Sequence, residues 1–141
     1  MQRDYILRQI EILGAILRRI RQRILGGATG EAASELAQAA TQVGVDFVMA
    51  QRLSAESLVA LLSVGAEPDV ARCLLYAEVL YVDGLRAEAE GAEPEARASF
   101  GKALLLFETA RTVSPVVITT ETEAKISELA QRLATPPPRN A

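Results

Sequence analysis

The sequence predicts an all-α domain of about six helices arranged as antiparallel hairpins. Half of its 141 residues are apolar but only 4% are aromatic. The core must therefore be aliphatic and rich in alanine, which suits closely packed helices better than sheets. Apolar residues recur at helical spacing, and glycines and prolines divide the chain into segments. A chain of this length fits one domain, which we place at residues 1–134 and expect to be followed by a disordered proline-rich tail at 135–141.

The first predicted helix covers residues 4–25 and ends at a Gly-Gly pair at 26–27, where glycine accommodates a left-handed cap. Six apolar side chains recur along it at spacings of three and four residues: Ile6, Ile10, Leu13, Leu17, Ile20 and Ile24. At about 100° per residue they form one straight seam. This seam must be buried against the chain itself, a second copy or another protein. Tyr5, Ile12 and Ile16 widen the apolar face beyond what one groove covers, so we expect the helix to contribute to self-association.

The same helix carries a basic rim toward its carboxyl end. Its members are Arg18, Arg19, Arg21 and Arg23. Cations at this end stabilise the helix macrodipole. An anionic membrane surface, nucleic acid and an acidic partner protein are alternative readings of the rim. The net charge of −3 and the acidic remainder of the chain argue against nucleic acid.

The middle of the chain, residues 29–112, is predicted to form helical hairpins. A helix at 29–42 opens this region. Residues 45–52 form either an irregular link or an extension of that helix. A short helix follows at 54–63, capped by its first residue, a serine.

Two longer helices complete the hairpins. The first is expected to begin with Pro68 in its first turn and to run to about Glu90, because proline is tolerated at that position. The same Gly-Ala-Glu-Pro punctuation returns before a second helix, which continues to about Arg111.

A connector and a last helix end the domain. The β-branched run at 116–119 could form a strand, but the sequence offers no second strand to pair with it, so we expect an extended linker. Thr120 and Glu123 make a capping box. It predicts a final helix at 120–133.

Large and small residues alternate across the two longer helices. Ala96, Phe100 and Ala103 follow the small-x3-aromatic-x2-alanine spacing of the second helix in a tetratricopeptide repeat. Leu80 and Gly84 lie on the preceding helix, where such repeats place one large and one small residue. Small side chains let two antiparallel helices approach, and one large residue fills the gap. The pattern predicts a TPR-like hairpin with these five residues in its core.

A second resemblance begins with residues 4–11, which read Asp-Tyr-Ile-Leu-Arg-Gln-Ile-Glu. Together with the helical hairpins, they resemble a family of small bacterial proteins of unknown function that share an Asp-Tyr-Ile-x-Arg-x-Ile-Glu start. The resemblance covers most of the chain. It implies a helical, TPR-like domain with no activity attached, and it supplies no functional residues.

The inventory of reactive side chains argues against an enzyme. The chain has no histidine, the commonest general base and metal ligand. The single cysteine, Cys73, follows the apolar pattern of its helix and is expected to be a buried structural thiol. One cysteine excludes an internal disulfide and is compatible with a reducing compartment.

Clustered carboxylates are the remaining candidates for a metal-binding or catalytic site. The glutamates between the two longer helices lack the spacing of a calcium loop, and we expect no metal there: Glu88, Glu90, Glu93 and Glu95. A carboxylate pair for hydrolysis could form among Glu78, Asp83 and Glu108. We expect no catalytic residue, no cofactor and no small-molecule substrate.

The predicted function is a non-enzymatic protein–protein interaction or scaffold module that forms a homodimer through its first helix. The alternatives are a peripheral membrane protein that uses the arginine-rich first helix and an enzyme with an unrecognised carboxylate site. Arg8 and Glu11 interrupt the apolar run that a signal peptide needs. We therefore expect a cytoplasmic location.

Overall fold

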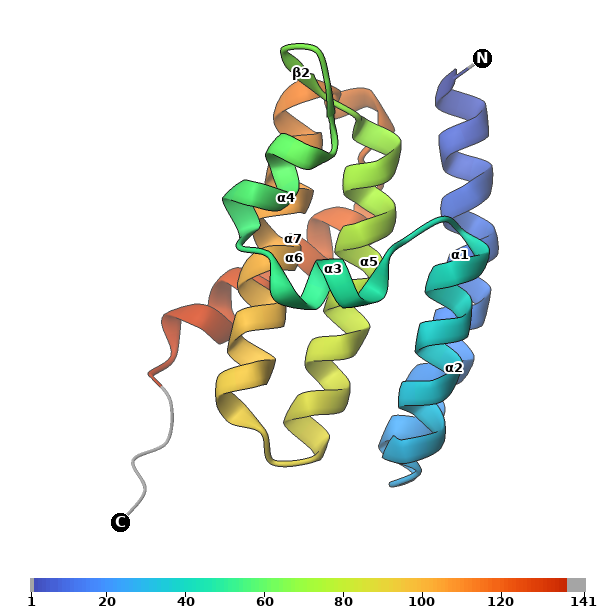
Figure 1. Cartoon of the computed structure of the whole chain (residues 1–141), viewed down its shortest axis with the longest axis vertical. Helices are drawn as coiled ribbons and strands as arrows, with labels where there is room; N and C mark the ends of the chain where they lie inside the picture. The colour runs from blue at the N-terminus through green and yellow to red at the C-terminus, as the bar shows by residue number, and fades with distance from the viewer. Residues whose placement is uncertain (1, 137–141) are drawn as a thin grey trace.

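The computed structural model describes residues 2–136 and confirms the all-α fold (Figure 1). Its helices are α1 (Gln2–Leu25), α2 (Thr29–Gln42), α3 (Phe47–Arg52), α4 (Ala55–Leu61), α5 (Val70–Ala89), α6 (Glu93–Val113), the 3₁₀ helix η1 (Pro115–Val117) and α7 (Thr120–Ala134). Two short strands, β1 (Ser63–Val64) and β2 (Glu67–Pro68), pair in an antiparallel hairpin. Residues 2–136 thus hold seven α-helices rather than the six expected.

Helix α5 lies at the centre of the molecule. It packs against α6 on one side and against α1 and α2 on the other, while α7 packs on α6 (Figure 1). Every residue from Cys73 to Gly84 is buried. A helix that is apolar on all sides is buried among its neighbours. The position of α5 therefore determines where the other helices can sit.

The five residues of the spacing pattern lie in the core. All five residues of the spacing pattern are buried at the contact region of α5 and α6: Leu80, Gly84, Ala96, Phe100 and Ala103. Phe100 is held between the two helices, as the spacing predicted. The small residues around its ring let the two helix backbones approach.

Several helix ends follow the local signals in the sequence. Gly27 has a φ of +87° where α1 ends, in agreement with the expected left-handed cap. Ser54 caps α4, its side chain accepting a hydrogen bond from the Ser57 amide at 3.1 Å. Both features depend only on residues that are close in the chain.

One predicted helix start is wrong by two residues, and one predicted cap is wrong by one residue although its helix begins at Thr120 as predicted. Pro68 belongs to β2, and α5 begins after Asp69, whose side chain accepts a hydrogen bond from the Arg72 amide. At the last helix the cap is Thr119, not Thr120. In each case a residue with a free side-chain oxygen and extended backbone takes the cap position.

Two linkers contain more helix than expected. Within residues 45–52, the segment after Asp46 forms the separate helix α3, because the Asp46 side chain accepts a hydrogen bond from the Met49 amide. The β-branched connector begins as η1 rather than as an extended linker. Within the described residues the connector pairs with no strand, as expected.

The chain leaves the domain after α7. The Thr135 carbonyl accepts a hydrogen bond of 2.9 Å from Arg97, so the first residue of the predicted tail is held by α6. Residues 137–141 of that tail lie outside the described residues. Between residues 2 and 136, no helix combines the length and apolar character needed to cross a membrane.

Candidate functional site

The apolar seam of α1 belongs to the core. Four of its members are buried in one cluster with the other helices: Leu13, Leu17, Ile20 and Ile24. Ile10 is half-buried and packs against the same cluster. The side chain of Ile6 lies outside the part of the chain that the structure describes. The described members of the seam therefore face the interior and are not available to a partner.

The apolar residues beside the seam, Tyr5, Ile12 and Ile16, form the flank of α1 and have a different environment. Tyr5 is 62% exposed and Ile12 is 50% exposed, whereas Ile16 is half-buried and packs on the core. Helix α2 has 14 residues against 24 in α1. It therefore covers only the carboxyl-terminal part of α1, and the amino-terminal part extends beyond it (Figure 1). Tyr5 and Ile12 stay uncovered because α2 is too short to reach them.

A groove of about 660 Å³ adjoins Tyr5 at this end of the molecule, and its lining holds apolar side chains together with Glu67 and Asp69. Val64 of the β hairpin, Val113 of α6 and Val116 of η1 line it, and all three are exposed. Four of the large exposed apolar residues of the chain therefore gather around one groove. Apolar side chains gathered in this way are typical of a protein-interaction surface.

The basic rim does not form a single patch. Arg23 forms ion pairs with Glu31 and Glu35 of α2. Arg18 and Arg19 are exposed. Arg21 is half-buried and turns toward α5. The four arginines thus have separate environments, which is a consequence of their positions around the helix.

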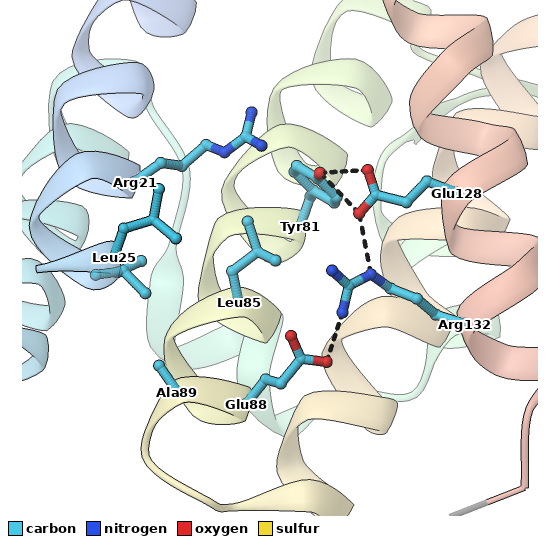
Figure 2. Close-up of a pocket in the computed structure, with 9 residues that line it drawn as sticks. Arg21, Leu25, Tyr81, Leu85, Glu88, Ala89, Glu128 and Arg132 are labelled. Atoms are coloured by element: carbon cyan, nitrogen blue, oxygen red, sulfur yellow. Dashed lines mark hydrogen bonds and ion pairs between the residues drawn. The ribbon is translucent and has the colours of Figure 1, made fainter. Parts of the chain in front are cut away.

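A second groove lies between α1 and α7, with α5 as its floor. Figure 2 shows Arg21 and Leu25 on the α1 side, Tyr81 and Leu85 on the floor, and Glu128 on α7. Its volume near Tyr81 is about 480 Å³. The guanidinium carbon of Arg21 lies 5.5 Å from the centre of the Tyr81 ring, a cation–π arrangement.

The Tyr81 hydroxyl donates a hydrogen bond to the Glu128 carboxylate, with oxygen–oxygen distances of 2.9 and 3.0 Å. Burial, and then this hydrogen bond, raises the pKa of Tyr81 to about 12. Arg132 of α7 donates to Glu128 at 3.0 Å and to Glu88 at 2.5 Å, and it stacks over Phe100 at 5.1 Å. This network ties α7 to α5 along the groove.

The carboxylates considered for hydrolysis have separate partners. The buried Glu78 pairs with Lys125 at 2.8 Å. The buried Asp83 pairs with Arg86 at 2.9 Å and accepts a hydrogen bond from Ser99 at 3.0 Å. In both cases a cation compensates the buried charge, as a stable fold requires.

The other carboxylates singled out in the sequence have a cationic neighbour or lie at a helix start. Glu108 lies 3.9 Å from Arg111, and Glu90 pairs with Arg86 at 2.8 Å. Glu93 and Glu95 lie in the first turn of α6, where acidic side chains complement the helix dipole.

Cys73 is buried in the core of α5. Burial, with a smaller contribution from Asp69, raises the pKa of its thiol to about 11. The thiolate, which is the nucleophilic form, is therefore disfavoured at neutral pH.

The sequence did not identify Tyr81, Lys125, Glu128 and Arg132 as site residues. The polar residues of α7 recur at spacings of three and four residues, so they could have been recognised as one face of a helix. Their contacts with α5 span 44 to 47 residues of chain. No local pattern identifies partners at such separations.

The chain matches no protein-family model, no curated protein and no solved structure. Its function is therefore inferred from its own geometry.

Proposed function

We propose that this chain is a non-enzymatic protein-interaction module that pairs with a second copy of itself through the exposed flank of α1. The observation that carries the proposal is the uncovered apolar surface at Tyr5 and Ile12. It lies where α2 ends short of the amino-terminal part of α1 (Figure 1). Two copies of one surface can cover each other in a two-fold pair.

The order of side chains along this flank suits antiparallel pairing. Tyr5, Ile12 and Arg19 are spaced seven residues apart and lie on one side of α1. In an antiparallel pair centred on Ile12, the two Ile12 side chains meet at the axis. Tyr5 of each copy then lies opposite Arg19 of the other copy, which allows a cation–π contact at both ends.

The neighbouring groove extends the contact area. A stable interface buries about 800 Å² on each partner, more than a few side chains of one helix supply. Val64, Val113 and Val116 lie beside Tyr5 in the groove and are exposed. The partner copy can cover these valines together with the flank of α1.

The proposal includes a cytoplasmic location, no catalytic residue and no nucleic-acid partner. The lack of histidine supports the absence of a catalytic residue. The net charge of −3 argues against a nucleic-acid partner. The buried and unreactive environment of Cys73 supports a structural role for the only thiol.

The test is the mass of the native particle in solution, measured by light scattering for the wild type and for the Ile12→Glu variant. We expect a dimer for the wild type and a folded monomer for the variant, because two carboxylates would meet at the axis. Val48→Glu is the matched control, since Val48 is 57% exposed but lies on α3. Ile16 is left unchanged because it packs on the core.

A wild-type protein that is monomeric at tens of micromolar would contradict the proposal. Loss of the dimer in both the Ile12→Glu and Val48→Glu variants would contradict it as well. Circular dichroism of each variant distinguishes dissociation from unfolding.

A further inference from the structure

We infer that the groove between α1 and α7 binds a segment of a partner protein in which acidic side chains adjoin apolar ones. This goes beyond the pairing of α1 flanks and uses a different surface. Arg21 is nine residues after Ile12, which places the two on opposite sides of α1. Both surfaces can therefore be occupied at the same time.

The charges on the α7 side of the groove are matched. Lys125 lies between two carboxylates, at 2.8 Å from Glu78 and 3.7 Å from Glu121. Arg132 likewise lies between Glu88 and Glu128. Each cation on this wall serves two acidic side chains, so the wall has no positive charge to offer a ligand.

The α1 side of the groove is positive and unmatched. Arg21 lines the groove, and Arg18 lies beside it at a small adjoining hollow that Arg21 and Tyr81 also line. Among residues 2–136, neither has a carboxylate within ion-pair distance, whereas Arg23 of the same helix pairs with α2. The two free guanidinium groups are three residues apart and lie about one helical turn from each other.

Arg21 is held in place for a ligand. Its guanidinium rests on the Tyr81 ring, and the Tyr81 hydroxyl is itself fixed by Glu128 (Figure 2). A half-buried guanidinium has lost part of its water but has gained no anion. A carboxylate placed there forms a charge-assisted hydrogen bond with little reorganisation, and the planar fork of arginine suits carboxylate geometry.

The groove is apolar next to Arg21. Leu25 is 87% exposed, and Leu85 and Ala89 lie on the neighbouring part of the floor (Figure 2). An almost fully exposed leucine beside a hollow of about 480 Å³ can cover one or two apolar side chains. The ligand therefore needs an apolar group directly next to its acidic group.

The opposite wall selects the class of ligand. Glu88 of α5 and Glu128 of α7 line the groove, and Glu121 of α7 lines the adjoining hollow beside Arg18. A surface with negative charge on all sides, such as an anionic bilayer or a nucleic acid, meets these carboxylates as well as the arginines. A peptide can direct its acidic side chain toward α1 alone, so a protein segment fits the groove best.

The test starts from a display library of random 12-residue peptides selected against the wild-type protein. Enriched peptides are then synthesised, and their binding is measured by fluorescence anisotropy. We expect enrichment of Asp or Glu next to Leu, Ile or Phe. The Arg21→Gln variant should bind such peptides about tenfold or more weakly, because it lacks a charged hydrogen bond.

Two further variants sharpen the result. Leu25→Ser removes apolar surface at an exposed position and should also weaken binding without affecting folding. Arg52→Gln is the matched control, because it removes the same charge from an exposed position on α3, outside the groove and outside the flank of α1, and it should bind as the wild type does. The Ile12→Glu variant should also bind normally, so this test and the test of self-association can fail independently.

Four outcomes would overturn the inference. They are no enrichment of any peptide, enrichment of peptides without acidic residues, equal binding by the Arg21→Gln and Arg52→Gln variants, and Arg21-dependent binding to phosphatidylglycerol vesicles. The last outcome would assign the groove to an anionic membrane.

Discussion

Gly84 of α5 lies directly against the ring of Phe100 of α6. A Cβ atom at position 84 would stand 2.4 Å from Cε1 and 2.5 Å from Cδ1 of that ring. Real Cβ atoms essentially never approach other heavy atoms so closely. The missing side chain of Gly84 therefore creates the space that Phe100 fills, and the two residues together set the separation of the two central helices.

Replacing Gly84 with alanine should lower the free energy of unfolding by about 1–3 kcal/mol, because the ring must shift inside a packed core. Urea denaturation measures this change. Gly101→Ala is the matched control, since Gly101 also lies in a long helix but a Cβ there meets nothing within 4 Å. We expect that control to be stabilised by about 0.5–1 kcal/mol, the difference in helix propensity. Equal destabilisation of both variants would contradict the close contact.

Removing the Phe100 ring should lower the free energy of unfolding more than the Gly84→Ala change does. Phe100→Ala should lower the free energy of unfolding by about 3–5 kcal/mol, the usual range for a buried phenylalanine. The double variant Gly84→Ala/Phe100→Ala should be less destabilised than the sum of the two single variants, because the Cβ atom added at position 84 no longer meets a ring. A cost below about 1 kcal/mol for Phe100→Ala would show that the ring does not support the hairpin.

The buried ion pair of Glu78 and Lys125 predicts an asymmetric effect. Lys125→Met should lower the free energy of unfolding by about 3–5 kcal/mol, because it leaves the Glu78 carboxylate buried without a cation. Adding Glu78→Gln to this variant should recover most of the loss. Arg111→Met is the control, since its pair with Glu123 is exposed and should be worth less than about 1 kcal/mol. A double variant no more stable than Lys125→Met alone would contradict the prediction.

Tyr81 predicts a loss of stability at high pH. Burial and then the Glu128 hydrogen bond raise its pKa from an ordinary value near 10 to about 12 in the folded chain. Between these values the folded chain keeps a proton that the unfolded chain has lost, so rising pH favours unfolding. This contribution to stability is present below about pH 10 and is lost as the pH rises toward about 12.

The comparison of the wild type with Tyr81→Phe isolates this effect. The difference in free energy of unfolding between the two proteins should change in favour of Tyr81→Phe as the pH rises from 10 to 12. The chain has three tyrosines and no tryptophan, so ultraviolet absorbance can follow phenol ionisation directly. A difference that stays constant over this range would show that the Tyr81 phenol is not stabilised in its neutral form.

Local signals in the sequence were sufficient to identify most helices of this protein. The seam of α1, the left-handed turn at Gly27 and the cap at Ser54 all depend on residues within one or two turns of each other. The spacing of Gly84 and Phe100 within their helices also indicated which residues form the core. The errors at Pro68 and Thr120 were errors of cap choice between adjacent residues, where several side chains compete for the same amides.

The surfaces available for binding were decided by the tertiary structure. The sequence could not separate core from interface on α1, because that depends on where the shorter α2 ends. It could not distinguish Arg21 from Arg23 either, since one meets Tyr81 and the other meets glutamates of α2. Helical periodicity indicates which residues share a face of a helix. Which element covers that face depends on tertiary contacts with distant parts of the chain. The sequence alone determined most of the helices and the composition of the core, and the packing around α5 decided which apolar and charged groups remained free.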